Sequence, residues 1–313
     1  MFEKKFLKLI IDKINNQSHN QNIQTINKLR LTMKHRAFSL IELSIVILII
    51  GILVAGVTSS SRLIRQIRIQ SARNLTVNSP VTSISSLHVW LETTSVNSFS
   101  SEQLDDGYLI ETWNDINPQS SYKNNALQST NSQKPIYKQS GLGSLLPVVS
   151  FTGSQMMAFA NQLLLKPVSY FFVIRPNTIG NEYAVTGTSA YGMGISISSS
   201  GYIVPVQQNY NLILLNPPHV FNTILNVNKL NLVYFQYASN GAYSCYSNGV
   251  LDCTPTTKDI NFVNQTLYLG YNPLSNNLFY NGDIAELIIY NKVLNDEERK
   301  SVEKYLTQKW SIK

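Results

Sequence analysis

The sequence is poor in cysteine, histidine and charged residues. It has two cysteines and four scattered histidines, and only 14% of its 313 residues are charged. No third or fourth ligand lies near the cysteines, so the spacing of a zinc site is absent. A glycine-rich phosphate loop, an HExxH motif and the spacing of a Ser/His/Asp hydrolase are also missing. These absences argue against zinc proteins, nucleotide-binding enzymes and serine hydrolases.

Positive charge is concentrated at the N-terminus. Residues 1–37 contain eight Lys/Arg and two acids, whereas residues 38–313 contain 17 Lys/Arg and 16 Asp/Glu. The larger part is nearly neutral, so the basic pI of the whole chain does not indicate nucleic-acid binding. No basic helix interleaved with aromatic residues appears there either. We therefore expect no nucleic-acid partner.

A long apolar run follows this basic segment. Between Phe38 and Val57 the only charged residue is Glu42. Twenty helical residues span about 30 Å, the thickness of a bilayer core, so the run predicts a transmembrane helix. A carboxylate in such a segment is costly, on the order of 3 kcal/mol near the centre, and therefore indicates a function.

The start of this run, Lys34-His35-Arg36-Ala37-Phe38 with Glu42, resembles the N-terminus of type IV prepilins and pseudopilins. In that family a membrane peptidase cuts after a small residue, usually Gly, and methylates the new N-terminus. The resemblance implies prepilin peptidase as a partner and cleavage between Ala37 and Phe38. Glu42 lies on the same helical face as residue 38. It would neutralise the new amine on its own chain or on a neighbouring pilin-like subunit.

The chain divides into four predicted segments. Residues 1–37 are a leader, unless Met33 starts a leader of five residues. Residues 38–79 form the membrane helix and a stalk that Pro80 ends, and residues 80–85 are a linker. Four basic residues flank the run on each side, so the orientation rests on the prepilin resemblance. A plain membrane anchor is the alternative interpretation.

The pattern of residues 86–313 predicts short strands separated by Asn, Ser and Gly clusters. This favours a mainly β domain, a sandwich or jelly roll. Asn295 and Glu298 form a capping box for a short C-terminal helix whose apolar face is Val302, Tyr305, Leu306 and Trp310. The predicted strands are Leu87–Leu91, Pro147–Phe151, Ser169–Arg175, Tyr202–Val206, Leu230–Tyr237, Thr266–Tyr271 and Asp283–Tyr290.

Eight segments of this part follow a recognisable order: His88–Glu92, Thr112–Asp115, Asn125–Gln128, Lys134–Tyr137, Pro147–Gly153, Tyr246–Val250, Phe279–Asn291 and Leu294–Trp310. Through them, this part resembles the concanavalin A-like, laminin G-like jelly-roll domains of bacterial surface proteins. The fold serves lectins, adhesins, glycosidases and structural modules, so the resemblance alone does not fix a function.

The two cysteines flank Asn248-Gly249, which is a hairpin signal. A two-residue loop would place Cys245 opposite Asp252, and a three-residue loop would place it opposite Cys253. We expect the three-residue loop and a disulfide, because an exported chain meets oxidising conditions. Two buried thiols are the alternative.

Two groups of acids are candidates for a chemical role. Asp283 and Glu286 come nearest to the carboxylate pair of glycosidases, but a spacing of three predicts opposite strand faces and a structural role. The candidate calcium ligands Asp105, Asp106 and Asp115 are close in sequence to Asn114, and solvated loop acids are the alternative. No other cofactor is indicated.

These observations predict a non-enzymatic minor pilin or pseudopilin. It would cross the bacterial inner membrane once and carry its C-terminal domain outside, in the periplasm or on a pilus or pseudopilus. A lectin-like head would bind a glycan or protein in adhesion or surface recognition. The alternatives are a membrane-tethered glycan hydrolase and an anchored surface protein that does not polymerise.

Overall fold

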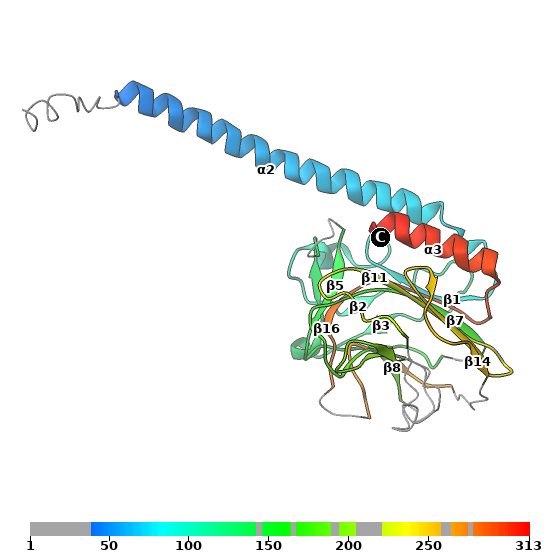
Figure 1. Ribbon diagram of the computed structural model, residues 1–313. Helices are drawn as coiled ribbons and strands as arrows, with labels where there is room; N and C mark the ends of the chain where they lie inside the picture. The colour runs from blue at the N-terminus through cyan, green and yellow to red at the C-terminus, as the bar shows by residue number, and fades with distance from the viewer. Residues whose placement is uncertain are drawn as a thin grey trace, which may run out of the picture. The chain divides into compact units, whose positions relative to one another are not determined.

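The computed structural model describes residues 39–141, 146–163, 167–188, 194–204, 221–257, 264–274 and 278–313. The leader, Ala37 and Phe38 lie outside these ranges. The chain forms two compact units, residues 1–61 and Arg62–Lys313. The second unit holds both sheets and is called the head below (Figure 1).

Helix α2 runs from Leu40 to Val77 and ends before Pro80, as the sequence predicts. Its last four turns, from Arg62, belong to the head. The predicted stalk from Arg62 onward is therefore part of the head. Within the residues that the structure describes, no helix combines the length and the apolarity needed to cross a membrane. The span expected over residues 38–57 stays a prediction.

The larger sheet has nine antiparallel strands in the described residues. Its main order is β13-β12-β11-β7-β16-β5-β4, with β1 paired to β16 and β14 paired to β12. The strands are β1 Leu87–Glu92, β4 Ile136–Lys138, β5 Val148–Thr152, β7 Val168–Pro176, β11 Asn231–Tyr237, β12 Ala242–Ser247, β13 Val250–Leu251, β14 Thr256–Thr257 and β16 Asn281–Tyr290.

The smaller sheet has seven described strands in the order β10-β9-β8-β15-β6-β3-β2, also antiparallel. Its strands are β2 Thr112–Trp113, β3 Ala126–Leu127, β6 Met157–Phe159, β8 Glu182–Gly187, β9 Ile195–Ile197, β10 Ile203–Val204 and β15 Leu267–Leu269. Short 3₁₀ helices cover Pro80–Thr82, Ser101–Leu104 and Asn131–Gln133. The head is a jelly-roll-like sandwich, as predicted.

Strand β16 is the centre of the larger sheet. One edge pairs with β7 along almost its whole length, while the other pairs first with β5 and then with β1. Its register against β7 shifts between Ile284 and Glu286, which marks a β-bulge. Because a bulge lets two consecutive residues face the same way, it changes which side chains of β16 share a face.

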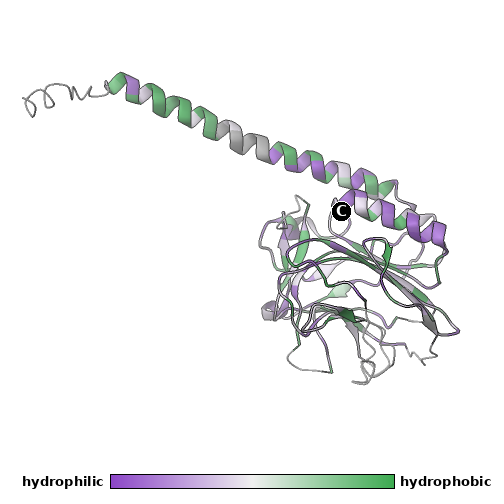
Figure 2. Ribbon diagram, in the orientation of Figure 1, coloured by the Kyte–Doolittle hydropathy of each residue, from purple (hydrophilic) through white to green (hydrophobic). Residues whose placement is uncertain are grey.

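Two apolar cores lie on the two faces of this sheet. The first is between the sheets and includes the stacked rings of Tyr170, Phe172 and Phe235. The second lies on the outer face, where Ala72 of α2 joins the C-terminal helix α3, Asp296–Trp310. Helix α3 is mostly hydrophilic (Figure 2), so it docks by the narrow apolar face that the sequence predicts. Its predicted capping box is also present.

Candidate functional sites in the N-terminal segment and the head

Glu42 caps the first turn of α2. Its Oε2 accepts a hydrogen bond from the backbone N–H of Ser39 at 2.9 Å, and the Ser39 hydroxyl accepts from the N–H of Ile41. The carboxylate therefore lies at the start of the helix, against the N–H of Ser39, which is the residue that follows Phe38 in the sequence. Cleavage at Ala37 and pairing of Glu42 with the Phe38 amine stay predictions.

The disulfide between Cys245 and Cys253 is present, with Cα atoms 5.6 Å apart. The expected three-residue loop is wrong. Asn248 and Gly249 both have positive φ, +49° and +83°, which gives the two-residue turn favoured by strand twist. The Asp252 N–H donates to the Cys245 carbonyl, so Asp252 occupies the opposite position. The strand has ended by Cys253, and a bend there lets the two sulfurs meet.

The three candidate calcium ligands have different surroundings. Asp115 is buried, and its carboxylate accepts hydrogen bonds from three backbone N–H groups, those of Trp90, Asn117 and Asn124. Asp106 accepts from a loop N–H, and Asp105 is exposed. Among the described residues, no three His, Cys, Asp or Glu side chains gather into a metal-binding group. A role for calcium stays a prediction.

The expectation that Asp283 and Glu286 face opposite ways is wrong. Ile284 and Leu287 both point into the core between the sheets, so the bulge leaves Ala285 and Glu286 together on the outer face. Asp283 is on that face too, in an ion pair with Arg175. Both carboxyl groups are fully buried, which agrees with the structural role expected for them.

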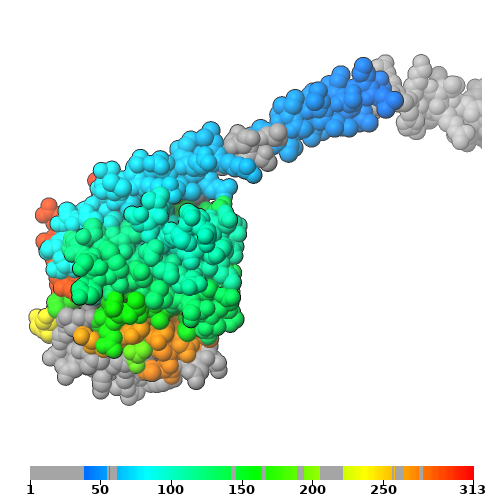
Figure 3. Space-filling view, turned by 180° about the vertical axis from the view of Figure 1, so that it is seen from behind, coloured from blue at the N-terminus to red at the C-terminus, as the bar shows by residue number. Residues whose placement is uncertain are grey.

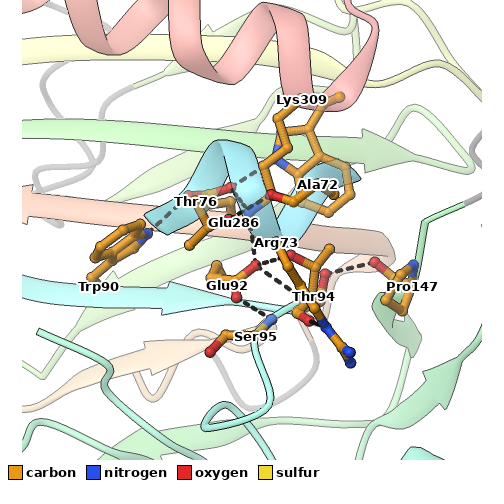
Figure 4. A network of polar contacts seen from close by, with 12 residues as sticks. Ala72, Arg73, Thr76, Trp90, Glu92, Thr94, Ser95, Pro147, Glu286 and Lys309 are labelled. Carbon is orange, nitrogen blue, oxygen red and sulfur yellow. Dashed lines mark hydrogen bonds and ion pairs between the residues drawn. The ribbon is translucent and has the colours of Figure 1, made fainter. Parts of the chain in front are cut away.

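Glu286 is the centre of a buried polar network on the outer face of the larger sheet (Figure 4). One carboxylate oxygen accepts hydrogen bonds from Trp90 Nε1 and the Tyr305 hydroxyl, each at 2.8 Å. The other accepts from Lys309 Nζ and Trp310 Nε1, also at 2.8 Å. Four donors from β1 and α3 thus converge on one acid of β16, and they fix where α3 lies.

Lys309 also pairs with a second acid, Glu92 at the end of β1. Its Nζ lies 2.7 Å from Glu92 Oε2, and the side chains of both residues are 0% exposed. Thr94 gives Glu92 two more hydrogen bonds, from its backbone N–H and its hydroxyl. Burial alone would raise the pKa of Glu92, but Lys309 and Thr94 outweigh it and lower that pKa. Burial would lower the pKa of Lys309, but Glu286 and Glu92 raise it.

The end of α2 is held against this network. The Thr76 and Tyr305 hydroxyls lie 3.3 Å apart, and Arg73 Nε donates to the carbonyl of Thr94 at 2.7 Å. Sequence reasoning missed the network, although a signal was available. Lys309 lies four residues after Tyr305, inside the apolar face of α3, where a cation needs a buried acidic partner.

Three aromatic side chains form a half-buried cluster on the smaller sheet and the hairpin after it. The rings of Tyr268 and Tyr271 meet at 6.1 Å, and those of Tyr271 and Phe279 at 4.8 Å. In β15 both neighbours of Tyr268 point into the core, so Tyr268 points outward. A group of partly exposed rings of this kind can stack on the apolar face of a sugar.

Comparison with known families finds both predicted segments. A profile described as the prokaryotic N-terminal methylation motif matches residues 32–58. A profile described as the concanavalin A-like lectin/glucanases superfamily matches residues 151–298. The chain carries a pilin-type methylation motif and a concanavalin A-like domain. No curated protein matches it.

Solved structures give distant likenesses. A Trypanosoma rangeli sialidase with 2,3-difluorosialic acid has 12% identity and a TM-score of 0.44, covering 72% of this chain and 33% of its own. Domain 4 of the arabinanase AbnA from Geobacillus stearothermophilus, in complex with arabinotriose, has 16% identity and a TM-score of 0.42. The match covers 69% of this chain and 97% of that domain. The ligand-binding domain of botulinum neurotoxin serotype D, in complex with N-acetylneuraminic acid, has 15% identity and a TM-score of 0.47. The match covers 72% of this chain and 52% of that one. This chain thus spans about a third of that sialidase.

Proposed function

We propose that this protein is a pilin-like subunit, a minor pilin or pseudopilin, whose head binds a glycan. One observation carries the proposal: a methylation motif and a concanavalin A-like domain occur on one chain. The junction in the head supports it, because α2 is joined to α3 and to the loop after β1 by hydrogen bonds and buried apolar contacts. The motif segment would enter the inner membrane and then the filament, and the head would be displayed.

Binding is favoured over hydrolysis by the state of the two candidate acids. Most glycoside hydrolases use two carboxyl groups that flank the scissile bond. Asp283 and Glu286 are both fully buried, one paired with Arg175 and the other occupied by four donors. The aromatic cluster of Tyr268, Tyr271 and Phe279 supports a glycan ligand, since stacking on rings needs no acid.

Intact-mass analysis tests the pilin part. Protein isolated from bacteria with an active prepilin peptidase should begin at N-methylated Phe38. The same protein from cells that lack the peptidase should keep its leader. A mature protein that begins at Met1 or Met33 in both strains would contradict the proposal.

A carbohydrate array tests the head. The purified full chain in detergent should bind some glycans without releasing products. Tyr268→Ala should weaken that binding about tenfold or more, because it removes a stacking ring. Tyr122→Ala is the matched control, since Tyr122 is 81% exposed and outside the cluster. Equal losses in both variants, or hydrolysis of the bound glycan, would count against the proposal.

A further inference from the structure

A concave site lies in the head, between α2 and the loops of the larger sheet. It has a volume of about 290 Å³, near the lower end of small-molecule sites, which is about 300 Å³. Ile69, Leu104 and Pro147 give it apolar walls. Arginines of α2 and the polar residues Gln66, Thr93, Thr94, Tyr137 and Gln139 also line it. Figure 3 shows this end of α2, in cyan, lying along the head.

The cationic lining comes from one face of the helix. Arg62, Arg65 and Arg73 are spaced so that their side chains project to the same side of α2. Arg68 lies on a different face and does not line the cleft. The sequence has no acid between Glu42 and Glu92, so no carboxylate on the helix can pair with these arginines at three or four residues' distance.

The groups of the head that accept hydrogen bonds from these arginines are uncharged. Arg65 donates to the side-chain oxygen of Gln139, and Arg73 Nε donates to the Thr94 carbonyl. Asp106 lies beside the cleft, where it accepts from the Gln139 N–H. None of the ion pairs in the described part of the chain joins Asp106, or any other acid, to Arg62, Arg65 or Arg73. Each guanidinium has five donors, so charge and hydrogen-bonding capacity remain for an anion.

We infer that this cleft binds the carboxylate or sulfate of an acidic saccharide, through the guanidinium groups of Arg62, Arg65 and Arg73. The inference rests on the proposed function, because it names the class of glycan. The site is concave, and it combines three cations with apolar walls, so it can enclose one charged sugar unit, which a flat surface cannot do. Arg–carboxylate pairs also form two parallel hydrogen bonds, which select for planar anions over neutral sugars.

The test is calorimetric titration of the full chain in detergent with two oligosaccharides of equal length. One is an oligogalacturonate and the other a neutral cello-oligosaccharide. We expect the acidic ligand to bind at least about tenfold more tightly, and its affinity to fall as salt is raised. Arg65→Gln should weaken the binding of the acidic oligosaccharide about tenfold. Arg68→Gln, the matched control on another face of the same helix, should leave it unchanged.

Other outcomes separate the two proposals. Equal binding of both oligosaccharides, unaffected by Arg65→Gln, would overturn the acidic site and leave the glycan-binding head standing. Equal losses in the two arginine variants would also overturn it. Binding of inorganic sulfate or of phosphatidylglycerol vesicles that needs Arg65, with no binding of either oligosaccharide, would overturn the acidic-saccharide site and assign the cleft to another anion source, while the array with Tyr268→Ala decides separately whether the head binds a glycan.

Discussion

Lys309 is the buried cation of the polar network on the outer face. Its single positive charge pairs with two fully buried acids, and its replacement would leave Glu92 and Glu286 without that cation. Lys309→Met keeps most of the side-chain volume. We expect it to lower the free energy of unfolding by about 3–5 kcal/mol, because removing one partner of a buried ion pair leaves uncompensated charge. Urea denaturation of the head, followed by fluorescence, measures the difference.

Lys304→Met is the control for this change. Lys304 is on the same helix but exposed, and it forms no ion pair with any acid in the part that the structure describes. Its replacement should alter stability by less than about 0.5 kcal/mol. If Lys309→Met unfolds at the same urea concentration as Lys304→Met, the network does not stabilise the fold.

Glu92 gives the head a predicted sensitivity to acid. Its pKa is lowered in the folded state, because Lys309 and Thr94 outweigh burial. A lowered carboxyl pKa stabilises the fold above the ordinary value of 4.5, and that stability is lost as the pH falls through the folded pKa. The pKa of Lys309 is raised above 10.5, so its contribution is constant in this window. Glu92→Gln should therefore flatten the loss of stability as the pH falls below 4.5, measured by urea titration at each pH. An unchanged slope would contradict this.

At the scale of elements, long or strongly patterned segments were predictable and short ones were not. The end of α2, the capping box of α3 and the central strands follow from apolar periodicity and from cap or proline residues. Strands β2 and β3 have two residues each, too few for alternation to show. The bulge in β16 was also hidden, because the register against β7 sets it and local sequence does not. That is why the faces of Asp283 and Glu286 were predicted wrongly.

The last turns of α2 act as an element of the head. Ala72 of α2 is buried in the outer core together with Val81 and Ile84 of the segment that follows the helix, and Thr76 contacts Tyr305. We expect a chain that begins at Arg62 to be markedly more stable than one that begins at Ser86. The difference should be about 3 kcal/mol or more, since several buried apolar side chains lose their packing. Thermal unfolding of the two truncated chains measures it, and equal melting temperatures would contradict it.

At the scale of the whole molecule, Glu42 is the residue through which the N-terminal segment would hold the head in a filament. Its carboxylate caps the first turn of α2 through the Ser39 N–H. After cleavage the Phe38 amine would lie next to that position, on the same chain or on a neighbouring subunit. Pairing with a carboxylate would compensate the buried positive charge and fix the register between subunits.

Glu42→Gln removes the negative charge of this side chain but keeps an oxygen that can cap the helix. The amide oxygen can still accept from Ser39, so the helix should begin at the same residue. It carries no charge, so the amine would lack its partner, and we expect incorporation into filaments to fall about tenfold or more. Quantitative immunoblotting of sheared filaments against total cell protein measures this, with Ser44→Ala as the control because Ser44 contacts only a backbone carbonyl within the described helix. Filaments that contain the Gln variant at the wild-type level would show that Glu42 acts only as a helix cap.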